Sequence, residues 1–201
     1  MVTIINYGMG NLGSVRNMFK RIGAACQITD DLETIHRAEK ILLPGVGAFG
    51  NAMKLLDEKG LREVLNQKAL TEKVPVLGIC LGMQLLTRGS EENPDAQGLC
   101  WIEADTLRFA FDDPALKVPH MGWNAIAPQK QHPLLPPGES RFYFVHSYFV
   151  RCDHASDVLA TTRYGHDFCS MIQRDNVFGA QFHPEKSHKF GMNLLENFSK
   201  I

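Results

Sequence analysis

The sharpest chemical feature of this sequence is a cysteine between two glycines. The segment Gly78-Ile79-Cys80-Leu81-Gly82 lies where a predicted buried strand, residues 74–79, passes into a predicted helix that starts at Leu81. Glycines on both sides permit a sharp turn and keep side chains away from the sulfur. Such a turn places the thiol at the carboxyl edge of the sheet, where the sites of α/β proteins form. The segment therefore predicts a nucleophilic cysteine; a buried cysteine between packing glycines is the alternative.

A cysteine nucleophile needs a base, and the best candidate is His183. It follows a predicted strand, residues 177–182, so it also lies at a strand end. Glu185 stands two residues further on, where its carboxylate can orient the imidazole and stabilise the imidazolium. A surface or capping histidine is the alternative, because closeness between Cys80 and His183 in space cannot be read from the sequence.

A glycine-rich turn, Pro44-Gly45-Val46-Gly47, follows the predicted strand at residues 41–43. It can present the Val46 N–H to a developing oxyanion, together with the N–H of Leu81. Glycines on both sides of Val46 make reorientation of a peptide sterically easy, so the turn can switch between an active and a silent form. An ordinary strand-to-helix turn is the alternative.

Strand and helix patterns alternate through the first half of the chain. This alternation predicts a parallel sheet covered by helices on both faces. The second half is rich in strand patterns and predicts antiparallel additions, so we expect one α/β domain over residues 1–201 with a mixed sheet. The predicted strands are 2–5, 26–29, 41–43, 74–79, 107–109, 141–150, 158–162, 170–174 and 177–182, and the predicted helices are 15–22, 51–70 (broken at Gly60), 81–86 and 189–198.

Composition narrows the functional classes. The 201 residues carry a net charge of −1, which offers no attraction for nucleic acid or an anionic membrane. The apolar start breaks at Asn6, too early for a signal peptide or a membrane span, so we expect a soluble cytoplasmic protein. Five irregularly spaced cysteines argue against a disulfide framework, and most are expected in the core. His183 and His188 lack the spacing of a helical zinc site, so no metal is expected.

Three separated segments together resemble the class I (triad) glutamine amidotransferases. They are Pro44–Gly47, the string from Pro75 to Leu86, and His183-Pro184-Glu185. The resemblance implies a flavodoxin-like fold and hydrolysis of glutamine to glutamate and ammonia by a Cys-His-Glu triad without a cofactor. It also implies a glutamine pocket formed by Gly47, Gln84, Ser147 and Tyr148; for Gln84, a solvated helix position is the alternative.

Further strings resemble the glutaminase subunits of imidazole glycerol phosphate synthases, enzymes of histidine biosynthesis. These strings are 6–14, 119–124 and 143–148, with Asn6 standing where many members carry aspartate. The resemblance implies a (β/α)₈-barrel cyclase that receives the ammonia in a heterodimer. A subunit serving another synthase, for example in sugar modification, and a silent binding module are the alternatives. The positions implied at the partner interface are Met121, Trp123, Asn124, Tyr143 and Lys186, although Trp123 would also suit the core.

Overall fold

Buried aliphatic runs alternate with amphipathic segments in the first half of the chain, and they form strands and helices in turn. The computed structural model describes residues 1–135 and 138–201. A left-handed Gly60 separates two helices, which confirms the predicted break. The elements of this half are β1 (Val2–Ile5), α1 (Leu12–Arg21), β2 (Cys26–Thr29), α2 (Leu32–His36), β3 (Ile41–Gly45), α3 (Phe49–Glu58), α4 (Leu61–Asn66), the π-helical turn η1 (Gln67–Thr71), β4 (Val76–Cys80) and α5 (Leu81–Leu85).

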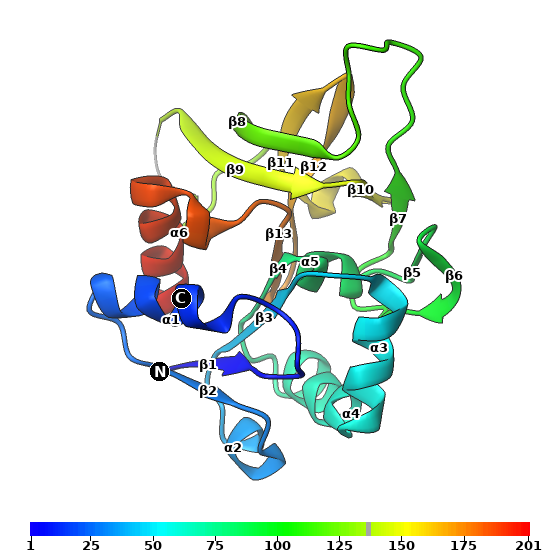
Figure 1. Ribbon diagram of the computed structural model, residues 1–201. Coiled ribbons are helices and arrows are strands. Elements are labelled where there is room, and N and C mark those ends of the chain that lie inside the picture. Colours follow the sequence, from blue (N-terminus) through cyan, green and yellow to red (C-terminus); the bar gives the residue numbers. More distant parts are fainter. Residues whose placement is uncertain (136–137) are drawn as a thin grey trace.

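The centre of the molecule is a parallel sheet with the strand order β2-β1-β3-β4-β13, in which β13 spans Val177–Ala180 (Figure 1). Every residue of β1, β3, β4 and β13 is buried, because helices cover both faces. This order is that of flavodoxin-like folds, whose sites form beyond the carboxyl ends of the strands. The prediction of an α/β domain with helices flanking a mixed sheet is confirmed.

Two hydrophobic cores lie on the two faces of this sheet. Helix α1 packs beside the C-terminal helix α6 (His188–Lys200) on one face, where Phe19 and Phe198 are fully buried. Helices α2 to α5 cover the other face through residues such as Leu56 and Leu65. Within the described residues, no helix is both long enough and apolar enough to cross a membrane.

The second half of the chain extends the sheet with mostly antiparallel strands. Strand β12 (His166–Arg174) pairs with β13 and also with β11 (Val158–Tyr164). Strand β11 in turn pairs with β8 (His120–Pro128), and β8 pairs with β9 (Ser140–His146), so these strands branch off the central sheet (Figure 1). The single strand predicted at 141–150 is two strands, which separate at Ser147. The elements are β5 (Gly89–Ser90), β6 (Asn93–Gln97), β7 (Ala104–Arg108), β8 (His120–Pro128), β9 (Ser140–His146), β10 (Tyr148–Cys152), the 3-10 turn η2 (Ala155–Asp157), β11 (Val158–Tyr164), β12 (His166–Arg174) and the 3-10 turn η3 (Pro184–Lys186).

Candidate active site

Cys80 occupies a strained turn between β4 and α5. Its backbone has φ +53° and ψ −110°, a region that residues with side chains rarely adopt. A Cβ on Gly82 would lie 1.9 Å from the carbonyl oxygen of Leu43, and one on Gly78 would lie 2.5 Å from the carbonyl oxygen of Gly82. Both glycines are therefore sterically required, and the turn holds the sulfur at the carboxyl end of the parallel strands.

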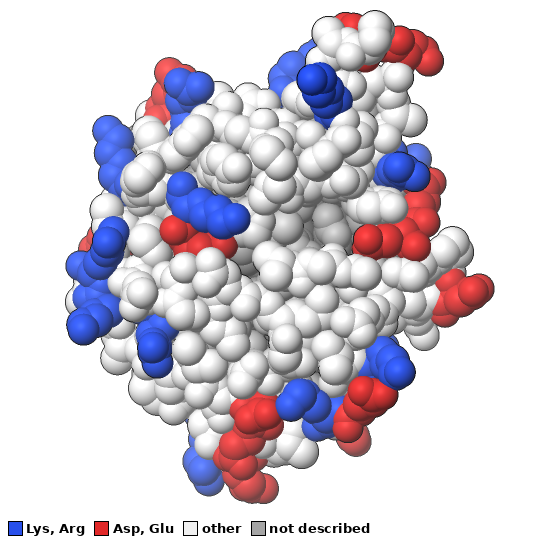
Figure 2. All heavy atoms as spheres, viewed as in Figure 1, with Lys and Arg blue, Asp and Glu red and all other residues white. Residues whose placement is uncertain are grey.

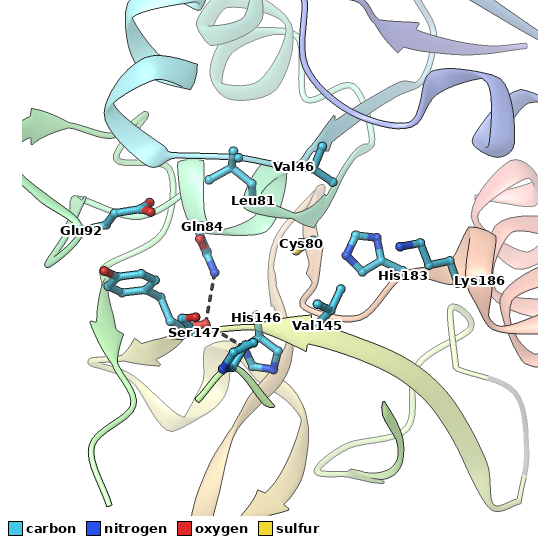
Figure 3. A pocket seen from close by; sticks show the side chains of 13 residues that line it. Val46, Cys80, Leu81, Gln84, Glu92, Val145, His146, Ser147, His183 and Lys186 are labelled. Atoms are coloured by element: carbon cyan, nitrogen blue, oxygen red, sulfur yellow. Dashed lines mark hydrogen bonds between the residues drawn. The ribbon is translucent and has the colours of Figure 1, made fainter. Parts of the chain in front are cut away.

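His183 lies beside Cys80 (Figure 3). Glu185 contacts the imidazole of His183. The Nδ1 atom of His183 is 2.7 Å from Oε1 of Glu185, and both side chains are almost fully buried, at 2% and 3% exposed. This contact leaves Nε2 as the nitrogen free to serve the thiol. Burial by itself would lower the pKa of His183, but hydrogen bonding to Cys80 and Glu185 and their charges outweigh it and raise the pKa to about 10.

Strand β9 holds the loop that carries His183. The N–H of His183 donates to the carbonyl of Tyr143 over 2.9 Å. The hydroxyl of Ser187 donates to the carbonyl of His183 over 2.6 Å and accepts the N–H of Tyr143 over 3.0 Å. Because Ser187 is fully buried, these bonds are shielded from water and fix the imidazole relative to the sheet.

A pocket of about 340 Å³ opens over Cys80. Every residue predicted for the triad, the oxyanion donors (Val46 and Leu81) and the glutamine pocket lines it, except Glu185, which contacts the imidazole of His183. The sequence did not predict Glu92, whose carboxylate accepts the N–H of Phe49 over 2.8 Å at the start of α3. The lining residues are Val46, Gly47, Cys80, Leu81, Gln84, Glu92, Pro119, Val145, His146, Ser147, Tyr148, His183 and Lys186.

The backbone of the 44–47 turn is held more tightly at Gly45 than at Gly47. Gly45 belongs to β3, and a Cβ there would lie 2.7 Å from the Tyr7 hydroxyl oxygen and 2.8 Å from the Gly82 nitrogen. The buried Tyr7 hydroxyl donates to the carbonyl of Pro44 over 2.8 Å and holds this end of the turn. Gly47 has φ +113°, and Val46 is 43% exposed. The backbone is therefore held at Gly45, and a reorientation of the turn would involve Val46 and Gly47.

Gln84 is buried rather than solvated, so the alternative for this residue is wrong. Its Nε2 donates to the carbonyl of Tyr148 and to Oε1 of Gln181, both over 3.2 Å. Gln181 in turn directs its own Nε2 to the Cys80 sulfur, 3.7 Å away. Gln181 was missed because its only signal is its place two residues before His183.

Four of the five predicted interface residues share the outer surface near the pocket. Met121 is 62% exposed and Trp123 41%, so Trp123 is not a core residue. Trp123 faces Tyr143 across β8 and β9, and the Lys186 ammonium lies 5.7 Å from the Tyr143 ring centre. The side chain of Asn124 turns to the inner face instead and donates to the carbonyl of Arg163 over 3.0 Å.

Figure 2 shows that the face viewed in Figure 1 is hollowed near its centre. Uncharged residues surround most of the hollow, and charged residues lie mainly towards the edge. Few charged residues and exposed aromatic side chains, such as that of Trp123, are typical of protein interfaces. The surface around the pocket is therefore suited to a protein partner.

The fold, the strained cysteine and the buried His183–Glu185 pair together define a triad amidotransferase. The model of class-I glutamine amidotransferases matches residues 3–201, and the chain belongs to this family. It is 49% identical to imidazole glycerol phosphate synthase subunit HisH 2 of Pseudomonas aeruginosa, with all of both chains covered. It is 50% identical to HisH 2 of Methanococcus maripaludis, covering 100% of this chain and 99% of that one. A crystal structure of a glutamine amidotransferase has the same fold, with a TM-score of 0.77 at 19% identity, covering 100% of this chain and 99% of that one.

Proposed function

We propose that this chain is the glutaminase subunit of an imidazole glycerol phosphate synthase. It hydrolyses glutamine to glutamate and ammonia and passes the ammonia to a cyclase subunit with a (β/α)₈ barrel. The heterodimer makes imidazole glycerol phosphate and aminoimidazole carboxamide ribotide in histidine biosynthesis, in the cytoplasm. The observation that carries the proposal is the buried His183–Glu185 pair beside Cys80 in one pocket. Relatives that share half of its residues over their full length and are named as this subunit support the pathway.

In the proposed mechanism, the thiol of Cys80 gives its proton to His183, and the sulfur attacks the carboxamide carbon of glutamine. The negative charge that develops on oxygen is stabilised by the N–H groups of Val46 and Leu81. Since the pKa of His183 is raised to about 10, its imidazole is protonated near pH 7 and can donate to the leaving ammonia. Water activated by His183 then cleaves the thioester and releases glutamate. Glu185 stabilises the imidazolium throughout the cycle.

We assign recognition of glutamine to Gly47, Gln84, Ser147 and Tyr148, which line the pocket together. Gln84 acts at least partly by holding the Tyr148 carbonyl. The cyclase is proposed to cover Met121, Trp123, Tyr143 and Lys186, with Asn124 acting from beneath this surface.

The test measures glutamate release by the chain alone, with the cyclase, and with the cyclase and its nucleotide ligand. The expected result is very slow release alone and a rise of at least about 10²-fold in the liganded complex, because one oxyanion donor is worth about that factor. No release under any condition would refute the glutaminase assignment. Full activity of the isolated chain would refute only the switching turn, and stimulation by another synthase but not by the cyclase would refute the pathway.

A further inference from the structure

A chain of four polar groups, of which the two histidines are buried, runs beneath the β8–β9 surface to the wall of the pocket. The Asn124 amide nitrogen lies 3.3 Å from Nε2 of His120. Nδ1 of His120 lies 3.0 Å from Nε2 of His146, and Nδ1 of His146 lies 2.7 Å from the carbonyl oxygen of Tyr148. Both histidines are almost fully buried, and the proposed mechanism uses neither of them.

At the pocket end of this chain of hydrogen bonds, the Tyr148 carbonyl determines which ring nitrogen of His146 carries the hydrogen. A carbonyl oxygen only accepts hydrogen bonds, so Nδ1 of His146 must carry the hydrogen that it shares with Tyr148. A neutral His146 then presents Nε2 as an acceptor. The Tyr148 carbonyl also accepts from Gln84, so two donors hold it in place.

At the other end, Asn124 independently determines which ring nitrogen of His120 carries the hydrogen. Nδ2 of Asn124 donates to the Arg163 carbonyl, while its Oδ1 accepts the N–H of Ala125 over 2.9 Å. This arrangement fixes which end of the amide faces His120, so Nε2 of His120 must be an acceptor. Its hydrogen therefore lies on Nδ1, where it meets the free Nε2 of His146. The two ends agree, and every donor in the chain has an acceptor.

An additional proton on either ring would break this order. On His146 it would place an N–H against the N–H of His120, and on His120 it would face the amide donor of Asn124. The surroundings also oppose charge. His120 stacks between the rings of Phe144 and Tyr164, with centroids 4.9 and 4.1 Å away. Burial lowers the pKa of His120 to about 4, and mainly burial lowers that of His146 to about 3.

We propose that His146, whose Nδ1–H donates to Tyr148 and whose Nε2 accepts from His120, is a positioning residue that holds the Ser147–Tyr148 wall for glutamine binding. This inference rests on the proposed glutaminase function. It adds that two neutral histidines, both as Nδ1–H tautomers, join the wall of the pocket to Asn124 beneath the proposed partner surface. This chain of hydrogen bonds acts on substrate binding through Tyr148, and neither histidine takes part in making or breaking bonds.

Two substitutions of His146 separate hydrogen bonding from packing. His146→Asn keeps an N–H donor near the Nδ1 position, whereas His146→Leu fills more of the space but donates nothing. In the cyclase complex, His146→Leu is expected to raise KM for glutamine about tenfold, the effect of one lost hydrogen bond, with kcat within about twofold. His146→Asn is expected to stay within about threefold of the wild type in KM. Phe168→Leu is the matched control, because Phe168 packs on both histidines without a polar atom, and its KM should not change.

A packing role predicts the reverse order, with asparagine worse than leucine, and that result would overturn the proposal. An unchanged KM in His146→Leu would also overturn it. Should the leucine variant fail to fold, long-range ¹H–¹⁵N NMR of the wild type at pH 7 still measures the tautomers of His120 and His146. The expected result is a hydrogen on Nδ1 and none on Nε2 for both histidines; an Nε2–H or a doubly protonated ring would refute it. An inactive wild type would count against the proposed function, whereas the tautomer measurement needs no activity.

Discussion

The hydroxyl of Ser187 lies 2.6 Å from the carbonyl oxygen of His183 and donates to it. Through the same oxygen atom Ser187 accepts the N–H of Tyr143, so one buried side chain joins the loop after β13 to β9. The orientation of the imidazole towards Cys80 thus depends on a residue outside the pocket lining.

Ser187→Ala should therefore lower kcat for glutamine by about tenfold or more, because the His183 loop loses its anchor. It should also reduce the free energy of unfolding by about 1–3 kcal/mol, since a buried N–H loses its partner. Steady-state kinetics and urea unfolding measure the two effects. Ser199→Ala is the matched control: its hydroxyl donates to the carbonyl of Glu196 near the end of α6, and kcat should be unchanged. A wild-type kcat in Ser187→Ala would contradict the positioning role.

Cys80→Ala should reduce glutamine hydrolysis by at least about 10³-fold, because no other group can form the thioester. Its thermal unfolding temperature should stay near that of the wild type. Cys26→Ala and Cys100→Ala serve as controls, since both thiols lie outside the pocket and should be dispensable. Hydrolysis near the wild-type rate in Cys80→Ala would refute the assignment of the nucleophile.

Glu185→Gln should lower the pKa of His183 from its raised value of about 10, because only Cys80 then remains of the two groups that offset burial. A less stable imidazolium should reduce kcat by at least about 10²-fold. The pKa is measured by ¹⁵N NMR of His183 and the rate by glutamate release. If the pKa does not move, Glu185 does not stabilise the imidazolium.

The buried histidines His120 and His146 should make the fold sensitive to acid. Their folded pKa values, about 4 and about 3, lie below the ordinary value of 6.5. The unfolded chain therefore takes up protons first, and stability that is complete above pH 6.5 falls as the pH drops towards 4. Each histidine contributes about 1.4 kcal/mol per pH unit to this fall. Urea unfolding between pH 6 and pH 4.5 should show a shallower pH slope for His120→Phe, and an equal slope would contradict the prediction.

Trp123→Ala should weaken binding of the cyclase by about 2 kcal/mol, because exposed tryptophans often anchor interfaces. Titration calorimetry measures the affinity. Leu70→Ala is the control: Leu70 is similarly exposed, at 46%, but lies in η1 away from the pocket and should not affect binding. Unchanged affinity in Trp123→Ala would remove this residue from the proposed interface.

Local patterns in the sequence were sufficient for the central fold and for the turn at Cys80. Strands buried on both faces appear as unbroken aliphatic runs, and helices show their apolar positions at a spacing of three and four. The glycines at 78 and 82 signalled the sharp turn because no other residue fits there. Strand β8 was missed, since Gly122 and Asn124 interrupt its pattern and one of its faces is exposed.

Relations between distant residues were decided only by the tertiary structure. The order and register of the strands bring His183 to Cys80, Gln84 to Tyr148, and His120 to His146. No local pattern encodes such pairings, because they depend on which strands become neighbours and on which face each side chain projects. The same alternation turns Asn124 inward while Trp123 faces outward, although the two are adjacent in the sequence. The sequence determined which chemical groups were present, and the packing of the sheet determined which of them meet.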